Sequence, residues 1–169
     1  MTVNEELRRE LAALLPRLRR FARTLAWQRE DADDLVQLAL ERALTKAQDQ
    51  WQPGTRLDAW VFRIMKNAWI DELRARGRQG EVMVASADAD ELGERVGESE
   101  SGALITRLSV HKAMQRLPEE QRLAVSLVLV EGLSYKEAAE SLEIPVGTLT
   151  SRLARGREAL QAMLIDAEV

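Results

Sequence analysis

The chain has 169 residues, of which 46% are hydrophobic; it carries a net charge of −4 and contains no cysteine. This length suits one larger or two small domains, and the lack of cysteine excludes disulfides and thiolate metal sites and fits a reducing compartment. Because no segment has the roughly eighteen uncharged apolar residues of a membrane span, and the first ten residues lack the apolar core of a signal peptide, we expect a cytoplasmic protein without membrane insertion.

The first 78 residues are predicted to be helical throughout. The segment "NEELRRELAALLPRLRRFARTLA" is amphipathic, and Pro16 inside it indicates a kink or a new helix start. A second helix is predicted over "DADDLVQLALERALTKA". Pro53 and Gly54 then predict a turn before a long helix over residues 56–78, which is rich in basic residues. We therefore expect an N-terminal helical domain over residues 1–78.

Two groups of side chains in this domain allow more than one interpretation. Asp31, Asp33 and Asp34 could bind a metal ion, but the glycine and spaced oxygens of a calcium loop are missing, so we interpret them as favourable charges at a helix N-terminus. Tryptophans at 51, 60 and 69 are either core residues or part of a surface for single-stranded nucleic acid, where aromatic rings stack on bases and arginines hold phosphates.

Residues 79–106 differ in composition from the segments around them. They carry one basic and seven acidic side chains and are rich in glycine, serine and alanine. Helical periodicity is lost here, and such a composition is typical of a chain that cannot bury enough apolar surface to fold. We predict a flexible acidic linker between two folded domains.

The C-terminal segment, residues 107–169, contains a predicted helix-turn-helix. Ser134 and Glu137 have the spacing of a capping box, and Pro145 ends one helix and can begin the next. The second helix places Leu149 and Leu153 on one face, whereas its other face is polar and basic. A short helix, a tight turn and a second helix with an exposed basic face is the arrangement that reads the major groove of DNA, although such a face is also common on ordinary solvated helices.

Nothing in the sequence supports catalysis. The single histidine, His111, has no accompanying nucleophile motif, and no phosphate-binding glycine loop or zinc-protease motif is present. We therefore expect no enzyme, no cofactor, no metal site and no small-molecule substrate.

Taken together, the motifs resemble those of a known family. The segments "DADDLVQLALERAL" and "RLDAWVFRIMKNAWIDELRAR" are similar to the sigma-2 domain, and "LPEEQRLAVSLVLVEGLSYKEAAESLEIPVGTLTSRLARGREAL" is similar to the sigma-4 domain, of bacterial sigma-70 factors of the extracytoplasmic-function (ECF) class. The resemblance implies an all-α protein with two small helical domains. It also implies a factor that binds core RNA polymerase, recognises the −10 and −35 elements of promoter DNA and helps to melt it, with an anti-sigma factor as a further partner.

The resemblance also implies roles for individual residues. Contact with core polymerase is implied for Asp34, Gln37, Glu41 and Arg42. Contact with the −10 element is implied for Thr55, Arg56, Trp60, Arg63, Lys66, Asn67, Arg74 and Arg76. Contact with the −35 element is implied for Thr148, Thr150, Ser151, Arg152 and Arg155. The chain departs from the family pattern at Leu38, where an acid is common, and at Thr150, where a basic residue is common.

Two other functions are compatible with the same motifs. One is a sigma mimic, which sequesters an anti-sigma factor without binding DNA; such a protein should have lost the basic DNA-facing residues, but Arg63 and Arg152 are present. The other is a stand-alone helix-turn-helix regulator, which would leave the N-terminal motifs without a role.

Overall fold

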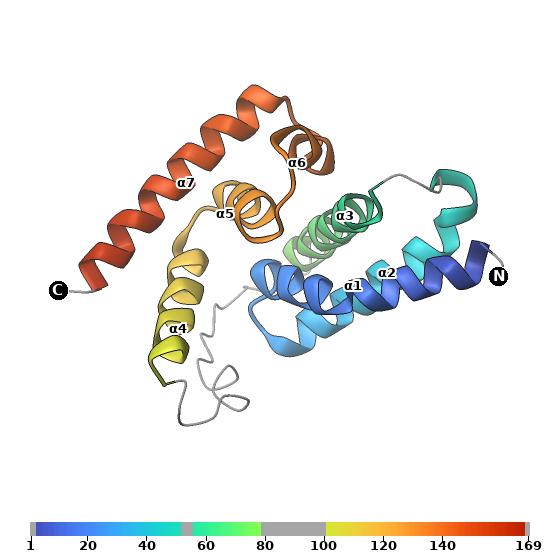
Figure 1. Ribbon diagram of the computed structural model, residues 1–169, viewed down its shortest axis with the longest axis horizontal. Coiled ribbons are helices and arrows are strands. Elements are labelled where there is room, and N and C mark those ends of the chain that lie inside the picture. The colour runs from blue at the N-terminus through green and yellow to red at the C-terminus, as the bar shows by residue number, and fades with distance from the viewer. Residues whose placement is uncertain (1–2, 52–55, 79–100, 168–169) are drawn as a thin grey trace.

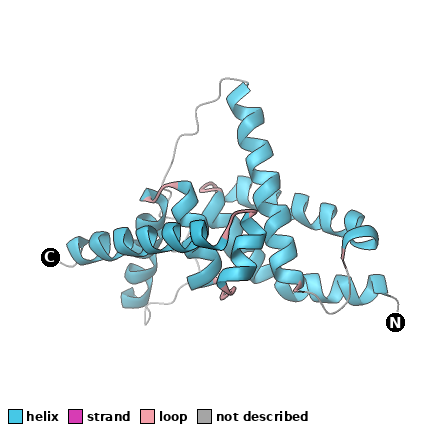
Figure 2. Ribbon diagram, turned by 90° about the horizontal axis from the view of Figure 1, so that it is seen from above, coloured by secondary structure: helices cyan, strands magenta, loops and turns pink. Residues whose placement is uncertain are grey.

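A computed structural model describes residues 3–51, 56–78 and 101–167, and the regular structure of these ranges is entirely helical (Figures 1 and 2). The predicted all-α fold class is confirmed. The N-terminal half contains α1 (Val3–Leu25), α2 (Arg29–Gln50) and α3 (Leu57–Arg78). The C-terminal half contains α4 (Ser101–Arg116), α5 (Glu119–Val125), the π-helical segment η3 (Ser126–Val130), α6 (Tyr135–Leu142) and α7 (Val146–Ala167). None of the described helices is long and apolar enough to cross a membrane.

Helix α1 shows how the N-terminal bundle forms. Its apolar residues recur every three or four positions, so that Leu7, Leu11, Leu18 and Phe21 are buried on the side that packs against α2 and α3. Pro16 lies inside this single helix, so it does not begin a new one. The apolar face keeps its register on both sides of Pro16, and its burial offsets the one backbone hydrogen bond that proline removes.

The three tryptophans that could be core residues or part of a nucleic-acid surface differ in their burial. Trp69 on α3 and Trp51 after α2 are 3% and 9% exposed and belong to the core. Trp60 is only partly buried and packs at the edge of the core. Burial of a large aromatic ring is a strong source of stability, so the core interpretation is correct for Trp69 and Trp51.

The predicted helix-turn-helix is present in the C-terminal half. Ser134 caps α6 by accepting a hydrogen bond from the Glu137 N–H at 3.1 Å, and the Glu137 carboxylate accepts one from the Ser134 N–H at 3.0 Å. The turn after α6 passes through Glu143, whose φ of 59° is left-handed. Pro145 then precedes α7, whose residues Leu149 and Leu153 are buried as predicted.

Helix α4 begins inside the range predicted as a linker, and the domain boundaries themselves stay a prediction. Helix α4 begins at Ser101, whereas the sequence placed the end of the linker at residue 106. Gly102 lowers the local helix propensity, but it falls in the first turn, where the penalty is small beside that of a glycine in the helix interior. Residues 79–100 lie outside the described ranges.

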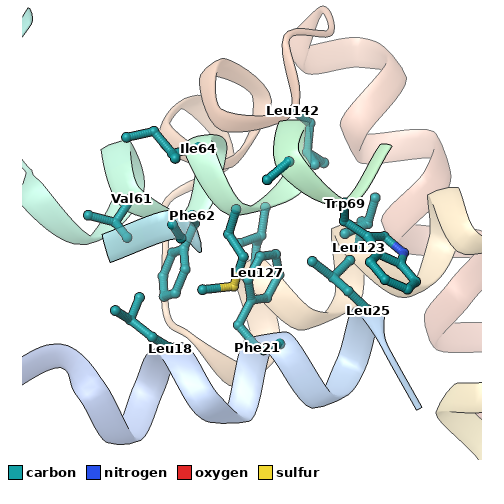
Figure 3. Close-up of a cluster of buried hydrophobic side chains, with 14 of the residues drawn as sticks. Leu18, Phe21, Leu25, Val61, Phe62, Ile64, Trp69, Leu123, Leu127 and Leu142 are labelled. Atoms are coloured by element: carbon teal, nitrogen blue, oxygen red, sulfur yellow. The ribbon is translucent and has the colours of Figure 1, made fainter. Parts of the chain in front are cut away.

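The two halves of the chain pack against each other and share a hydrophobic core (Figure 3). Leu123 and Leu127 from the α5–η3 segment meet Phe21 and Leu25 of α1, close to Phe62 of α3. The rings of Phe21 and Phe62 are 4.9 Å apart between centroids. Leu127 is 1% exposed, so the contact between the halves is as dry as the interior of a domain.

Candidate nucleic-acid and polymerase interfaces

The polymerase-docking residues implied by the resemblance lie on α2. Asp34, Gln37 and Glu41 are exposed and, at spacings of three and four, share one face of this helix. Arg42 is half-buried and lies 3.7 Å from Asp71 on α3. Leu38 is partly buried and packs against the core, so the departure from an acid at this position adds apolar contact. The exposed face of α2 is thus acidic and free to meet a basic partner.

Five of the residues implied in −10 binding lie just before α3 or along the face of α3 that is turned towards α6: Arg56, Trp60, Arg63, Lys66 and Asn67. Arg63 and Asn67 approach the Glu143 carboxylate at 3.9 Å and 3.2 Å. The Lys66 ammonium donates to the carbonyl of Leu142 at 3.5 Å. Burial lowers the pKa of Lys66, although the nearby charge of Glu143 acts in the opposite direction.

A second cluster fixes the N-terminal end of the same face. The Asp58 carboxylate accepts from Arg56 at 2.8 and 2.9 Å, from Arg17 at 3.0 Å and from the Ala59 N–H at 2.8 Å. Burial alone would raise the pKa of Asp58, but the hydrogen bonds from Arg56, Ala59 and Arg17 outweigh it and lower the pKa to about 2. Arg56 also pairs with Glu137 of α6 at 2.8 Å.

Between α3 and α6 these residues surround a cavity of about 450 Å³. Its wall includes Trp51 and Trp60, together with Arg56, Arg63 and Glu137. The indole N–H groups of both tryptophans are buried and have no acceptor among the described residues. Aromatic rings beside guanidinium groups are features that hold an unstacked base, whereas the two buried indole N–H groups do not face the cavity.

Two further residues of the implied −10 set, Arg74 and Arg76, lie apart from this cluster. Arg74 is exposed near the end of α3. Arg76 donates to Asp31 at 2.8 and 3.2 Å and to Glu72 at 3.0 Å, and its guanidinium lies 5.5 Å from the centre of the Trp69 ring. Arg76 therefore ties α3 to the start of α2 and has little capacity left for phosphate. Thr55 lies outside the described residues.

The residues implied in −35 recognition lie on the first half of α7. Thr150, Ser151 and Arg155 are exposed, and Thr148 and Arg152 are half-buried. The hydroxyls of Thr150 and Ser151 donate to the carbonyls of Val146 and Gly147 at 2.9 and 3.1 Å. Arg152 lies 3.6 Å from the exposed Glu120, a pairing that water and salt weaken. This face of α7 remains accessible while the two halves are packed together.

The contacts between the halves include residues that the sequence did not single out. The side chain of Glu131 is fully buried and pairs with Arg17 and Arg20 of α1. Arg17 also donates to the Glu131 carbonyl at 2.8 Å. The run "RLRRFAR" in α1 is a basic cluster that could have drawn attention, but no local pattern indicates its partner 111 residues away.

Comparisons with known proteins agree with this architecture. Residues 107–160 match the family described as "Sigma-70, region 4", and residues 11–66 match the "Sigma2 domain of PhyR". The chain is 38% identical to the ECF RNA polymerase sigma factor EcfG of Rhodopseudomonas palustris, over 97% of this chain and 88% of the relative. The chain belongs to the ECF class of sigma-70 factors.

Other relatives of this ECF sigma factor support the same assignment. It is 33% identical to the ECF RNA polymerase sigma-E factor of Escherichia coli K12, over 77% of this chain and 72% of the relative. Its fold is similar to that of RpoE in complex with the anti-sigma factor NepR from Bartonella quintana, with a TM-score of 0.81 and 34% identity over 95% of this chain and 97% of that one. CnrH in complex with the cytosolic domain of CnrY is similar with a TM-score of 0.63 and 26% identity, over 96% of this chain and 91% of that one.

Proposed function

We propose that this ECF sigma factor binds core RNA polymerase through the acidic face of α2, holds the opened −10 strand on α3 and reads the −35 element with α7. The proposal is carried by one observation: the chain is 38% identical to an ECF sigma factor over nearly its whole length. Such a factor supplies DNA recognition and strand opening to the cytoplasmic polymerase and performs no bond chemistry of its own.

The chemistry of each surface supports its proposed role. Exposed carboxylates on α2 suit a basic partner surface. On α3, Trp60, Asn67 and the neighbouring basic residues offer stacking, an amide for a base edge and charge for phosphates, which together offset the few kcal/mol (about 2–4) needed to extrude a base. On α7, Arg152 and Arg155 follow the helix N-terminus at the spacing of a groove-reading helix.

An anti-sigma factor is a further proposed partner. One similar structure holds the sigma factor RpoE together with the anti-sigma factor NepR, and the other holds CnrH together with the cytosolic domain of CnrY. The close similarity to RpoE over 95% of this chain makes a protein of that kind a reasonable partner here.

The test is reconstitution with core polymerase of the source organism, followed by transcription of sheared genomic DNA and mapping of transcript 5′ ends. The proposal predicts stable association with core and transcripts that begin at a limited set of sites only when this protein is present. Association with core but no site-specific transcripts would favour a sigma mimic. Sequence-specific DNA binding without association with core would favour a stand-alone regulator.

A further inference from the structure

The first turns of α7 expose two side chains that carry methyl groups. Val146, the first residue of the helix, is 45% exposed, and Thr150 is exposed one turn further along. Residues four positions apart are neighbours on the surface of a helix, so these two side chains stand side by side. Figure 1 shows α7 along one outer edge of the molecule. The start of a recognition helix is the part that contacts base edges in the major groove, so both side chains are placed to meet bases.

The hydroxyl groups on this part of α7 are engaged inside the helix. The Thr150 hydroxyl donates to the Val146 carbonyl at 2.9 Å, and the Ser151 hydroxyl donates to the Gly147 carbonyl at 3.1 Å. A hydroxyl has a single proton, so neither side chain has a donor left for the N7 and O6 acceptors of guanine. What Thr150 can offer a base is its methyl group and the lone pairs of its oxygen.

Gly147 leaves the helix surface open between these side chains. A Cβ atom at this position would meet nothing within 4 Å among the described residues outside its own stretch of helix, and its φ is not positive. Neither packing nor backbone conformation therefore calls for glycine here. The lack of a side chain instead lets an outside group come close to the backbone beside Val146 and Thr150.

An A·T base pair matches this surface better than a G·C pair. Thymine carries a C5-methyl group in the major groove, which suits apolar contact with Val146 and with the methyl group of Thr150. Its partner adenine presents an amino donor, which suits the free lone pairs of the Ser151 oxygen. Guanine presents acceptors, and the donors that suit them are the guanidinium groups of Arg152 and Arg155 further along the helix.

We propose that Val146 and the methyl group of Thr150 read thymine methyl groups in the −35 element, so that the first two turns of α7 select A·T pairs. Val146 is thereby a specificity residue that the sequence did not single out. Thr150 stands where a basic residue is common in the family, so this chain exchanges a charged donor for an apolar contact. This inference rests on the proposed −35 role of α7.

The test removes single methyl groups from the DNA. Deoxyuridine differs from thymidine only in lacking the C5-methyl group, so it deletes the proposed contact and keeps the base pairing. The probe is a labelled duplex with the −35 element of a promoter found by 5′-end mapping, titrated with the holoenzyme. Each thymine of the element is replaced in turn. We expect the affinity to fall about fourfold at one or two thymines, the equivalent of one buried methyl group, and to stay unchanged at the others.

Protein variants assign each sensitive thymine to a side chain. Val146→Ala should abolish the effect of deoxyuridine at one thymine. Thr150→Val keeps the methyl group and should keep the sensitivity at the second thymine, whereas Thr150→Ser keeps the hydroxyl group and should lose it. Ile165→Ala is the matched control, because Ile165 is an apolar residue, 62% exposed, near the other end of α7. This control should match the wild type at every thymine. Circular dichroism checks that each variant retains its helical structure.

The outcomes separate this proposal from the proposed function. If the holoenzyme starts transcripts at specific sites but tolerates deoxyuridine at every −35 thymine, or if the mapped −35 elements contain no A·T pair, the proposal is wrong and the sigma-factor role stands. Sensitivity that persists in Val146→Ala and Thr150→Ser would assign the effect to DNA shape and also overturn it. So would the reverse order of Thr150→Val and Thr150→Ser, because Thr150 would then act through its hydroxyl group. If no site-specific transcripts form, both proposals fail.

Discussion

Asp58 holds Arg17 of α1 and Arg56 together at the start of α3, and its replacement by asparagine tests this contact directly. Its carboxylate is 8% exposed and accepts hydrogen bonds from Arg17, from Arg56 and from the Ala59 N–H. Asparagine has nearly the same shape but carries no charge, so Arg17 and Arg56 lose this anionic partner and each keeps only its other one, Glu131 and Glu137 respectively. The change therefore removes the charge pairing and leaves the packing in place.

The expected loss of folding stability in Asp58→Asn follows from the pKa of Asp58. The pKa is about 2 in the folded protein and 3.8 for an ordinary aspartate, a difference equivalent to ~2 kcal/mol of stability. Because the folded pKa is the lower one, this stability is fully present above the ordinary pKa and is lost as the pH falls towards 2. The Asp58→Asn variant lacks this contribution at every pH.

Urea denaturation followed by circular dichroism measures the free energy of unfolding. We expect wild type and Asp58→Asn to differ by about 2 kcal/mol at neutral pH and by about half of that near pH 3. Asp71→Asn is the matched control, because Asp71 is 62% exposed and its contact with Arg42 is long, so its loss should cost less than about 0.5 kcal/mol. A difference between wild type and Asp58→Asn that is the same at both pH values would refute the reasoning.

Three further predictions address the proposed contacts. Asp34→Arg should weaken binding to core polymerase by at least about 1 kcal/mol, because the new positive charge opposes a basic partner surface; anisotropy of the labelled protein measures this affinity. The free energy of unfolding from urea denaturation should change by less than about 0.5 kcal/mol. Unchanged affinity would exclude α2 as the docking face. Asn67→Ala should slow open-complex formation on duplex promoters by the equivalent of about 1–3 kcal/mol. Templates that are already mismatched at the −10 element should partly restore the rate. An equal loss on both kinds of template would exclude a role in melting. In the holoenzyme, Arg152→Ala should weaken binding to duplex DNA that carries the −35 element by about 1–3 kcal/mol and should relax the sequence preference. Arg157→Ala should weaken binding to all sequences alike. The same loss of sequence preference in both variants would contradict base reading by Arg152.

The elements of this fold were predictable because they depend on neighbours in the sequence. Leu149 and Leu153 recur at helical spacing, and Ser134 and Glu137 meet within a single turn, so both patterns are visible without tertiary structure. Trp69 was ambiguous, because a helical aromatic beside basic residues suits a core or a nucleic-acid surface. Its 3% exposure follows from how α2 and α3 pack, which periodicity does not determine.

The contacts between the halves could not be predicted from local patterns. Arg20 and Glu131 are 111 residues apart, and many carboxylates in the chain are equally plausible partners for an arginine. Glu143 was hidden for another reason: a left-handed residue after a helix is expected to be glycine, so the sequence gives no sign of the conformation that brings its carboxylate to Asn67. Arg76 was assigned to DNA by the family resemblance, whereas its position beside Asp31 depends on how α2 and α3 pack.

Promoter opening by the assembled holoenzyme tests the central claim most directly. A fluorescent adenine analogue placed in the −10 element of a promoter found by 5′-end mapping reports the loss of base stacking when the strands separate. We predict a rise in fluorescence only when core polymerase and this sigma factor are both present, and a slower rise with Asn67→Ala. Stable association with core polymerase and no rise in fluorescence on any mapped or family-type promoter would contradict the account.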